Sequence, residues 1–453
     1  MPIKNISVKN FKSIQNIDVT LKDINLLIGA NGSGKSNFIE IFRFLGQIID
    51  YGIDNAISMQ GGIEYLRNCN IGPSENLEIS IILDLINEQP TFDIGRKIEH
   101  YKINIIKLQY TLTLDFTKKS QNSNFLIIES MEIEYTTSKI NKKQSTFGES
   151  PDLLNPTKII SDSLGEGKLK FSKNPEFTTE LNYPSKLEEN KREDFKKNLL
   201  NSLLYEDSEE SKKESNVSLL NPIVSIPHFP LALILDEIVK PYFKVDIFDF
   251  DPRLAKKASL FTGKLKLEED GSNLPIILKN IIKNDKQKSK FNKKLSYVLP
   301  FIKELGVEDI LDKSTILKLN EKSFNNSLPA FLISDGTIHV VCLIIALFYN
   351  NLFDSRYNTK GLIIEEPERN LHPALILKIS DLIQKASSKK QIIITTHNPE
   401  FLRNFPIENI LLVYRNEKEF SSIINPQNSE RIKKFLQDDI GVDQLYIESL
   451  LEP

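Results

Sequence analysis

Gly29-Ala-Asn-Gly-Ser-Gly-Lys35-Ser36 is the stretch of sequence that decides the fold. It fits the pattern G-x-x-x-x-G-K-[ST], in which glycines let backbone N–H groups turn inward around phosphate oxygens. The apolar run Ile24–Ile28 comes before it and is predicted to be a strand, and a helix is predicted from Lys35 to Ile49. This order of strand, turn and helix is the context that the pattern requires, because the N-terminus of a helix attracts anions. The sequence therefore predicts a phosphate-binding loop in an α/β protein.

The polar residues of this loop have separate expected roles. Lys35 is expected to reach the β- and γ-phosphates of a nucleotide, and the Ser36 hydroxyl is expected to bind Mg²⁺. The other loop residues expected to contact the nucleotide are Asn31, Gly32, Ser33, Gly34 and Asn37. ATP and Mg²⁺ are therefore the predicted ligands.

A second stretch, Gly361-Leu-Ile-Ile-Glu365-Glu366-Pro, is an apolar strand that ends in two acids. In a P-loop enzyme the first acid lies on the Mg²⁺ side, and the second accepts a proton from the attacking water or orients it. A strand followed by two acids also occurs at surface turns, so the phosphate loop is what favours the catalytic interpretation. Glu365 is a candidate Mg²⁺ ligand, although Asp is more usual there, and Glu366 is the candidate catalytic base.

A histidine follows the next predicted strand, in Thr395-Thr396-His397-Asn398, 31 residues after Glu366. A histidine at the C-terminal edge of a strand can contact the γ-phosphate and sense its loss. A lone histidine is more often structural, but this placement favours the sensor interpretation for His397.

A helix that precedes the acidic strand begins in Leu332-Ile-Ser334-Asp-Gly336-Thr337. Serine, glycine and a helix N-terminus can again form an anion site. The predicted strand order separates this segment from Lys35, so Ser334 and Gly336 would bind the nucleotide of a second copy. A simple N-cap turn is the alternative.

The rest of the chain alternates between patterns. Residues 77–135 have the period-two pattern of an antiparallel sheet, and residues 136–184 are predicted to be loop because they are rich in Ser, Asn, Pro and Lys. Residues 328–414 alternate helix and strand as in a parallel sheet with right-handed crossovers. Further predicted elements are an exposed helix within 185–215, a strand at 244–250 and helices at 273–282 and 291–302.

Composition narrows the class of protein. The chain has 453 residues, 40% of them hydrophobic, a net charge of −3 and two cysteines, Cys69 and Cys342. This composition excludes a disulfide framework and a cysteine-rich zinc site, and it suits a reducing cytoplasm. No signal peptide is recognisable, and the longest apolar run is far shorter than the ~20 residues that cross a bilayer. We therefore expect a cytoplasmic protein without membrane contacts.

Together these motifs resemble the RecF/SMC-like ATPases, which are ABC-type heads found in DNA repair, chromosome maintenance and phage defence. The resemblance includes Lys9-Asn-Phe-Lys12-Ser, the phosphate loop, Ser334-Asp-Gly and Glu365-Glu-Pro-Glu-Arg-Asn-Leu-His-Pro. The chain looks closest to stand-alone bacterial AAA-domain ATPases, which have Gln60-Gly-Gly and Asp270-Gly-Ser-Asn-Leu. Residues 90–240 match only by position.

The resemblance implies a fold and a set of roles. The fold is an α/β split head with an antiparallel lobe and a mixed insert, divided into residues 1–60, 61–240, 241–325 and 326–453. Gln60 would contact Mg²⁺ and the attacking water, and Lys12 would lie near the nucleotide. Ser334 and Gly336 would close over the γ-phosphate of a partner copy, with Glu366 as base and His397 as sensor.

Several relatives of such heads are disfavoured. Residues 60–334 contain no long heptad run and no Cys-x-x-Cys, which argues against a long-armed SMC protein or a zinc-hook ATPase. Only 56 residues follow His397, so we expect any nuclease domain to reside in another chain. Ser-Asp-Gly-Thr at 334–337 also differs from the Ser-Gly-Gly-Gln of transporters.

Two functions remain open. The first is an ATP-driven switch, a homodimer or higher oligomer that controls DNA or a partner effector in phage defence or DNA repair. The second is a slowly hydrolysing, ATP-bound scaffold that holds a nuclease or toxin. Seven lysines and one acid within residues 278–294 could follow a nucleic-acid backbone, or could form a solvated helix face.

Overall fold

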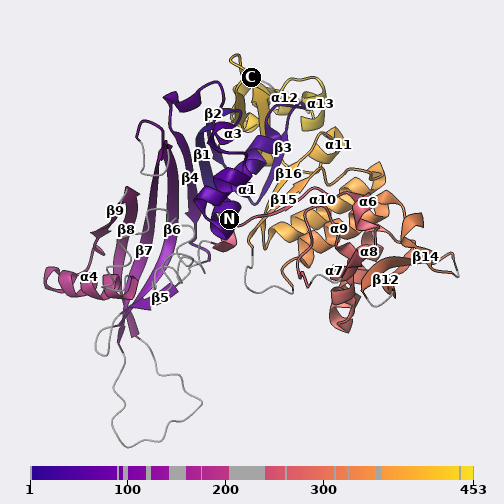
Figure 1. Ribbon diagram of the computed structural model, residues 1–453, viewed down its shortest axis with the longest axis horizontal. Coiled ribbons are helices and arrows are strands. Elements are labelled where there is room, and N and C mark those ends of the chain that lie inside the picture. Colours follow the sequence, from indigo (N-terminus) through magenta and orange to yellow (C-terminus); the bar gives the residue numbers. More distant parts are fainter. Residues whose placement is uncertain are drawn as a thin grey trace, which may run out of the picture. The chain divides into compact units, whose positions relative to one another are not determined.

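The computed structural model of the protein (Figure 1) describes residues 3–88, 91–94, 100–118, 124–141, 160–174, 176–203, 240–260, 263–310, 313–324, 326–352, 359–437 and 440–451. The chain divides into two compact units. The first comprises Met1–Thr20 and Phe44–Lys240, and the second comprises Leu21–Arg43 and Pro241–Pro453. The segment that carries the phosphate loop therefore belongs to the same unit as the C-terminal half. Within the described ranges, no helix is both long and apolar enough to cross a membrane.

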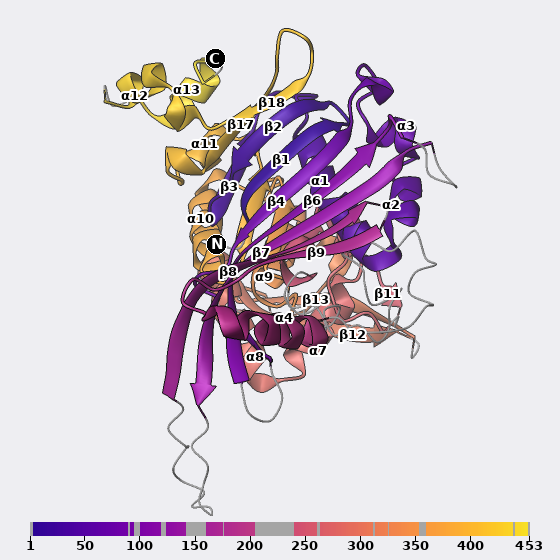
Figure 2. The same cartoon turned by 90° about the vertical axis from the view of Figure 1, so that its left-hand side faces the viewer.

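An antiparallel sheet forms the first unit (Figure 2). Its strands pair in the order β2-β1-β4-β6-β7-β8-β9, and β5 also pairs with β6. The strands are β1 (Ile3–Phe11), β2 (Ile14–Thr20), β4 (Leu77–Asp84), β5 (Thr91–Ile94), β6 (His100–Asp115), β7 (Leu126–Asn141), β8 (Ile160–Asn174) and β9 (Glu176–Asn182). Helices α2 (Ile53–Met59), α3 (Ile63–Leu66) and α4 (Glu189–Leu203) accompany them.

Strand β4 shows why these residues form a sheet with one buried face. Alternate residues from Leu77 to Leu83 are fully buried, and the residues between them are partly exposed. This period-two burial confirms the antiparallel sheet predicted from the sequence. Strands β6 and β7 bury a polar pair as well, in which the Tyr110 hydroxyl donates to Glu129 at 2.6 Å.

The loop predicted for residues 136–184 is wrong. Strand β7 continues to Asn141, and β8 and β9 follow, while residues 142–159 lie outside the described residues. Opposite charges on neighbouring strands explain the polar composition, since the Lys168 ammonium lies 2.9 Å from Glu134 and 3.3 Å from Glu132. Such cross-strand pairs stabilise a sheet without apolar alternation.

A mainly parallel sheet forms the centre of the second unit. Its strands are β10 (Asp246–Phe248), β15 (Gly361–Glu365), β16 (Gln391–Thr395), β3 (Ile24–Ile28), β17 (Ile410–Arg415) and β18 (Ser421–Ile424), in that spatial order. All of these pairs are parallel except β17 with β18. Strands β3 and β16 are buried along their whole length, as is usual for parallel sheets covered on both faces.

Helices surround this sheet. They are α6 (Pro252–Ala255), α7 (Leu274–Ile282), α8 (Asp285–Val298), α9 (Asp335–Phe348), α10 (Pro373–Ser387), α11 (Pro399–Leu402), α12 (Glu430–Gln437) and α13 (Val442–Ile447), and α1 (Lys35–Tyr51) begins here and ends in the first unit. Residues 337–347 of α9 are all buried, so this helix lies within the core.

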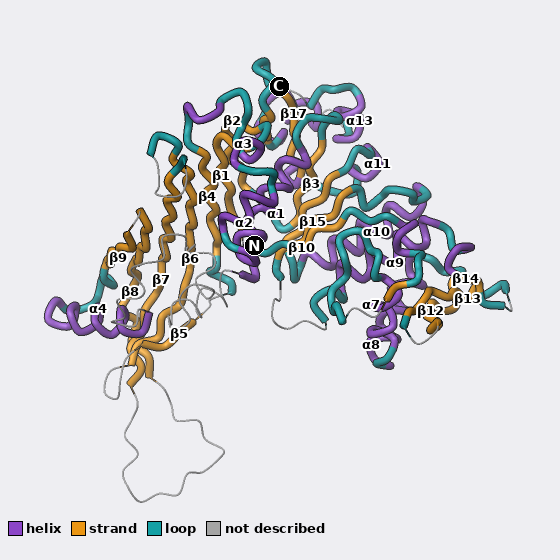
Figure 3. The backbone as a smooth tube through the Cα atoms, in the orientation of Figure 1, coloured by secondary structure: helices purple, strands orange, loops and turns teal. Residues whose placement is uncertain are grey.

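A small antiparallel sheet packs with α7 and α8, and its strands appear in orange in Figure 3. It consists of β11 (Ser259–Leu260), β12 (Ile302–Ile310), β13 (Ser314–Glu321) and β14 (Leu328–Pro329). The helix predicted for residues 291–302 instead ends at Val298, and β12 begins at Ile302. Pro300 accounts for the change, because proline lacks the N–H that a helix would need.

Candidate active site

Three parallel strands of the second unit end at one edge of the sheet. Glu365 of β15 lies beside Thr395 of β16, and Thr395 lies beside Leu27 of β3. The phosphate loop follows β3, Glu366 follows β15 and His397 follows β16. Residues far apart in the sequence therefore meet where α/β proteins bind their ligands.

Glycines shape the phosphate loop. Gly32 and Gly34 have φ angles of 75° and 114°, a region that side chains rarely allow. At Gly29 an added Cβ would lie 2.0 Å from the Val413 carbonyl oxygen, so no other residue fits there. The loop needs these glycines to turn its backbone closely beneath a bound group.

Lys35 supplies the positive charge of the loop. Its ammonium donates to the carbonyl oxygens of Gly29 at 2.8 Å and Ala30 at 3.0 Å, and the residue is 9% exposed. Burial lowers the pKa of Lys35, while the negative charges of Glu366 and Glu365 act in the opposite direction. A buried ammonium bonded to neutral carbonyls fits a phosphate, which would supply the missing counter-charge.

Strands β17 and β18 support the loop from outside. Arg415 donates through Nε to the Gly32 carbonyl at 2.9 Å, and the Ser421 hydroxyl donates to the Ser33 carbonyl at 2.7 Å. A cavity of about 660 Å³ lies beside the loop and is lined by Ala30, Asn31, Gly32, Ser33, Val413, Tyr414, Arg415 and Glu419. Arg415 was not predicted from the sequence, because no local pattern marks a residue that contacts a loop so far upstream.

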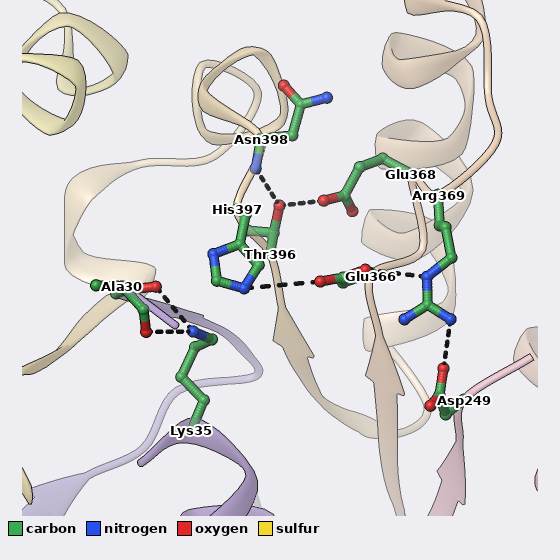
Figure 4. A network of polar contacts seen from close by, with 10 residues as sticks. Ala30, Lys35, Asp249, Glu366, Glu368, Arg369, Thr396, His397 and Asn398 are labelled. Carbon is green, nitrogen blue, oxygen red and sulfur yellow. Dashed lines mark hydrogen bonds and ion pairs between the residues drawn. The ribbon is translucent and has the colours of Figure 1, made fainter. Parts of the chain in front are cut away.

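Glu366 has a strained backbone. Its φ angle is 45°, and its N–H donates to the Thr395 carbonyl at 2.9 Å. Such a conformation is uncommon for a residue with a side chain and occurs often at functional sites. Its carboxylate lies between the His397 ring, 3.6 Å away, and the Arg369 guanidinium, 2.9 Å away (Figure 4).

Glu365 and Ser36 are the residues that would hold Mg²⁺. Burial raises the pKa of Glu365, and the negative charges of Asp249 and Glu269 raise it further. The positive charges of Arg43 and Arg369 act in the opposite direction. A cation would relieve this repulsion, and the partly buried Glu365 carboxylate and the exposed Ser36 have the oxygen donors that a hard metal ion takes.

His397 lies between Lys35 and Glu366 (Figure 4). Burial and the Lys35 charge lower the pKa of His397, and the Glu366 charge raises it. The ring is thus neutral at physiological pH and can donate one hydrogen bond. The structure brings together Lys35, Glu366 and His397, and their predicted roles in ATP hydrolysis stay predictions.

Five further residues, which Figure 4 labels, extend the network around Glu366 and His397. Arg369 joins Glu366 to Asp249, where its Nη1 lies 2.8 Å from the carboxylate. The Thr396 hydroxyl donates to buried Glu368 and accepts the Asn398 N–H at 3.0 Å. No role was predicted for these side chains from the sequence, although Arg369 is three residues from Glu366 and Asp249 directly follows a strand.

Ser334 begins α9 as its N-cap. Its hydroxyl accepts the Thr337 N–H at 3.1 Å, and it is exposed. An added Cβ on Gly336 would lie 2.6 Å from the Asn370 carbonyl oxygen, so the helix start packs closely on the loop that follows Glu366. Asp335 pairs with Lys256. This geometry establishes the N-cap turn and leaves the Ser334 side chain accessible.

Gln60 and Lys12 belong to the first unit. Gln60 ends α2, and its amide donates to Gln47 at 2.9 Å. Lys12 has a φ angle of 47°, and its N–H donates to the Leu66 carbonyl at 2.9 Å. Their predicted contacts with Mg²⁺ and nucleotide stay predictions.

Comparison with known proteins identifies the family of this chain. The family described as "AAA domain, putative AbiEii toxin, Type IV TA system" matches residues 24–403. Endonuclease GajA of Bacillus cereus (strain VD045) is 23% identical over 424 residues, which cover 92% of this chain and 59% of that protein. The chain therefore spans about three fifths of this relative.

Solved structures with a similar trace include SMC heads. An SMC head bound to the C-terminal winged-helix domain of ScpA has 12% identity, a TM-score of 0.46 and coverage of 94% of this chain and 97% of that one. The SMC head domain from Thermotoga maritima has 11% identity, a TM-score of 0.35 and coverage of 94% and 99%.

The sheet order, the phosphate loop and the family match agree with one another. They confirm the predicted α/β P-loop head and, at the level of the family, the predicted resemblance. The chain belongs to the AAA-domain family described as the putative AbiEii toxin of type IV TA systems, and it is a P-loop ATPase.

Proposed function

We propose that this ATPase is a switch in which two copies close around two ATP molecules and separate after hydrolysis. The observation that carries the proposal is the accessible Ser334 at the start of α9, for which no bond to the phosphate loop exists among the described residues. Phe331 and Leu332, just before it, are 74% and 58% exposed. An exposed apolar pair beside an exposed helix N-terminus suits a surface that another copy covers.

The chemistry follows from the residues at the sheet edge. Lys35 and the loop N–H groups would hold the phosphates, and Ser36 and Glu365 would hold Mg²⁺, which neutralises phosphate charge. Glu366 would accept a proton from water as the water oxygen bonds to the γ-phosphorus and the bond to the β,γ-bridging oxygen breaks. Neutral His397 would donate to the γ-phosphate and so respond to its loss.

The switch is proposed to act on DNA or on an effector. The relative from Bacillus cereus is named an endonuclease, so a nuclease is one class of effector on which we propose that the switch acts. Phage defence and DNA repair are the roles that the family resemblance supports. Exposed lysines on α8 are the proposed path for a nucleic-acid backbone.

The test of the catalytic assignment is Glu366→Gln. ATP binding should persist, while hydrolysis should fall by about 10²-fold or more, because the amide cannot accept the proton. Glu400→Gln, an exposed acid at the start of α11, is the matched control and should hydrolyse ATP at the wild-type rate. Equal turnover in wild type and Glu366→Gln would refute Glu366 as the base.

The test of assembly uses the same variant. With hydrolysis blocked, ATP should convert Glu366→Gln to a dimer in sedimentation velocity, and Ser334→Arg should abolish this conversion because its side chain would obstruct the partner's phosphates. A monomer fraction that ATP leaves unchanged would contradict the shared site. A dimer that hydrolyses ATP slowly, at the same rate with and without DNA, would favour the scaffold alternative.

A further inference from the structure

Arg369 holds the carboxylate of Glu366 from the side away from Lys35 (Figure 4). We infer that Arg369, anchored by Asp249, is a positioning residue for ATP hydrolysis, which leaves one chosen oxygen of Glu366 to receive the proton of water. The inference rests on the proposed role of Glu366 as the base, and it concerns what makes that base effective.

The two oxygens of Glu366 have different surroundings. Oε2 accepts from Arg369 Nε at 2.9 Å, a normal hydrogen bond. Oε1 lies 3.6 Å from His397 Nε2, which is longer than a hydrogen bond. The guanidinium therefore occupies one oxygen, and the oxygen that faces the His397 side retains its capacity to accept.

The shape of the guanidinium makes this arrangement possible. Arg369 uses Nε for Glu366 and Nη1 for Asp249, at 2.9 and 2.8 Å. A rigid planar fork can bind two carboxylates in a defined relative orientation, whereas a lysine ammonium is a point charge at the end of a flexible stem. Orientation of the base, in addition to charge, thus depends on this residue.

Backbone hydrogen bonds fix both Asp249 and Arg369. Asp249 follows β10, which pairs with β15 from Asp246 to Phe248, and its N–H donates to the Glu269 carbonyl at 3.0 Å. Arg369 closes the turn that begins at Glu366, because its N–H donates to the Glu366 carbonyl at 2.9 Å. The carboxylate is therefore held through backbone and side chain together.

The experiment compares steady-state ATP hydrolysis by the full chain and its variants. Arg369→Gln should lower kcat by about 10- to 100-fold, the scale expected when a reacting group is misplaced. KM and nucleotide affinity should stay within about twofold of wild type, because the Arg369 guanidinium binds two carboxylates and is not among the groups proposed to hold the phosphates. Arg369→Lys should recover only a small part of kcat, and guanidinium ion should partly restore Arg369→Ala.

Asp249 provides the second half of the test. Asp249→Asn should lower kcat by a smaller factor, and the double variant with Arg369→Gln should match Arg369→Gln alone, since Asp249 acts through Arg369. Arg403→Gln, which breaks the ion pair with Asp443 elsewhere in the unit, is the matched control and should leave kcat unchanged.

The outcomes separate this inference from the proposal beneath it. A slow Glu366→Gln with an unimpaired or faster Arg369→Gln would overturn the positioning role and leave the base in place. A loss in Arg369→Gln that appears mainly in KM would also overturn it. If Glu366→Gln itself turned over like wild type, the base assignment would fail first.

Discussion

Lys35 is held ready for an anion that the protein does not itself provide. Its ammonium bonds to two carbonyl oxygens, and it forms no ion pair within the described ranges. The two acids that affect its pKa are the same acids that water and Mg²⁺ would need. We therefore expect the phosphates of a nucleotide to act as the partner of the Lys35 ammonium, within the same cluster of residues that is proposed to catalyse hydrolysis.

His339 should make the fold sensitive to acid. Its Nε2 lies 3.0 Å from the Pro367 carbonyl, and burial lowers the pKa of His339 to about 4, with a smaller contribution from the Arg369 charge. The unfolded chain binds this proton near pH 6.5, and the folded chain binds it only near pH 4. Stability is thus retained above pH 6.5 and should fall by about 3 kcal/mol as the pH drops to 4.

Urea unfolding midpoints between pH 7 and pH 4.5 measure this effect. His339→Asn should flatten the part of the pH dependence that His339 causes, even if it lowers stability at every pH. His372→Asn replaces an exposed histidine, keeps an N-cap for α10 and should follow the wild-type curve. An unchanged slope in His339→Asn would show that other groups cause the acid sensitivity.

Single residues could be predicted where the neighbouring sequence positions form a recognisable motif. The glycines and Lys35 of the phosphate loop, and Glu366 after an apolar strand, have signals within a few positions of themselves. Arg415 does not, and neither does the second contact of Arg369, because their partners Gly32 and Asp249 lie 383 and 120 residues away in sequence. Such partners become visible only when the sheet has placed them together.

At the scale of elements, strands with an apolar face were predictable, and strands that rely on charge pairs were not. Helix α9, strand β15, helix α10 and strand β16 follow one another in the order predicted for residues 328–414. Strand β8 was missed because its lysines meet glutamates of β7, an arrangement that one sequence does not reveal. Strand β12 was missed because the helical pattern seemed to extend beyond Pro300.

Helix α8 should bind a nucleic-acid backbone through its exposed lysines. Lys286, Lys290 and Lys293 are exposed and have no ion pair within the described ranges, whereas Lys288 pairs with Glu304 at 2.6 Å. Burial lowers the pKa of Lys294, and the positive charges of Lys290 and Lys389 lower it further. An anion beside these lysines would offset their mutual repulsion.

The variant Lys286→Glu, Lys290→Glu, Lys293→Glu should weaken DNA binding and reduce the salt slope of log K by about three, one for each lost phosphate contact. Binding is measured at two salt concentrations with ATP present, and hydrolysis should persist. The same charge change on exposed lysines of the first unit, Lys186, Lys196 and Lys197, is the control. An unchanged salt slope would show that α8 is a solvated helix face that does not contact DNA.

At the scale of the whole molecule, a shared site predicts complementation. Lys35→Ala and Ser334→Arg should each abolish hydrolysis alone, since each removes one half of every site in a homodimer. Mixed in equal amounts, they should recover about a quarter of the wild-type rate, because half of the dimers then contain one intact site. Steady-state turnover of the mixture measures this recovery.

Two results would contradict the shared site. Normal hydrolysis by Ser334→Arg alone would show that the residue takes no part in turnover. Inactive mixtures, in a background where cross-linking proves that heterodimers form, would show that each copy works with its own residues.

The position of strand β3 in its sheet affects when the phosphate loop can fold during translation. Its hydrogen-bonding neighbours are β16 and β17, so Ile24 pairs with Ile392 and Leu26 with Ile410. A ribosome that adds about 5–20 residues per second needs roughly 20–70 s to travel that distance along the message. Until then the strand beneath the phosphate loop lacks both flanks, and Arg415 has not yet been made. We therefore expect a nascent chain to bind nucleotide only after residues 391–415 have been translated.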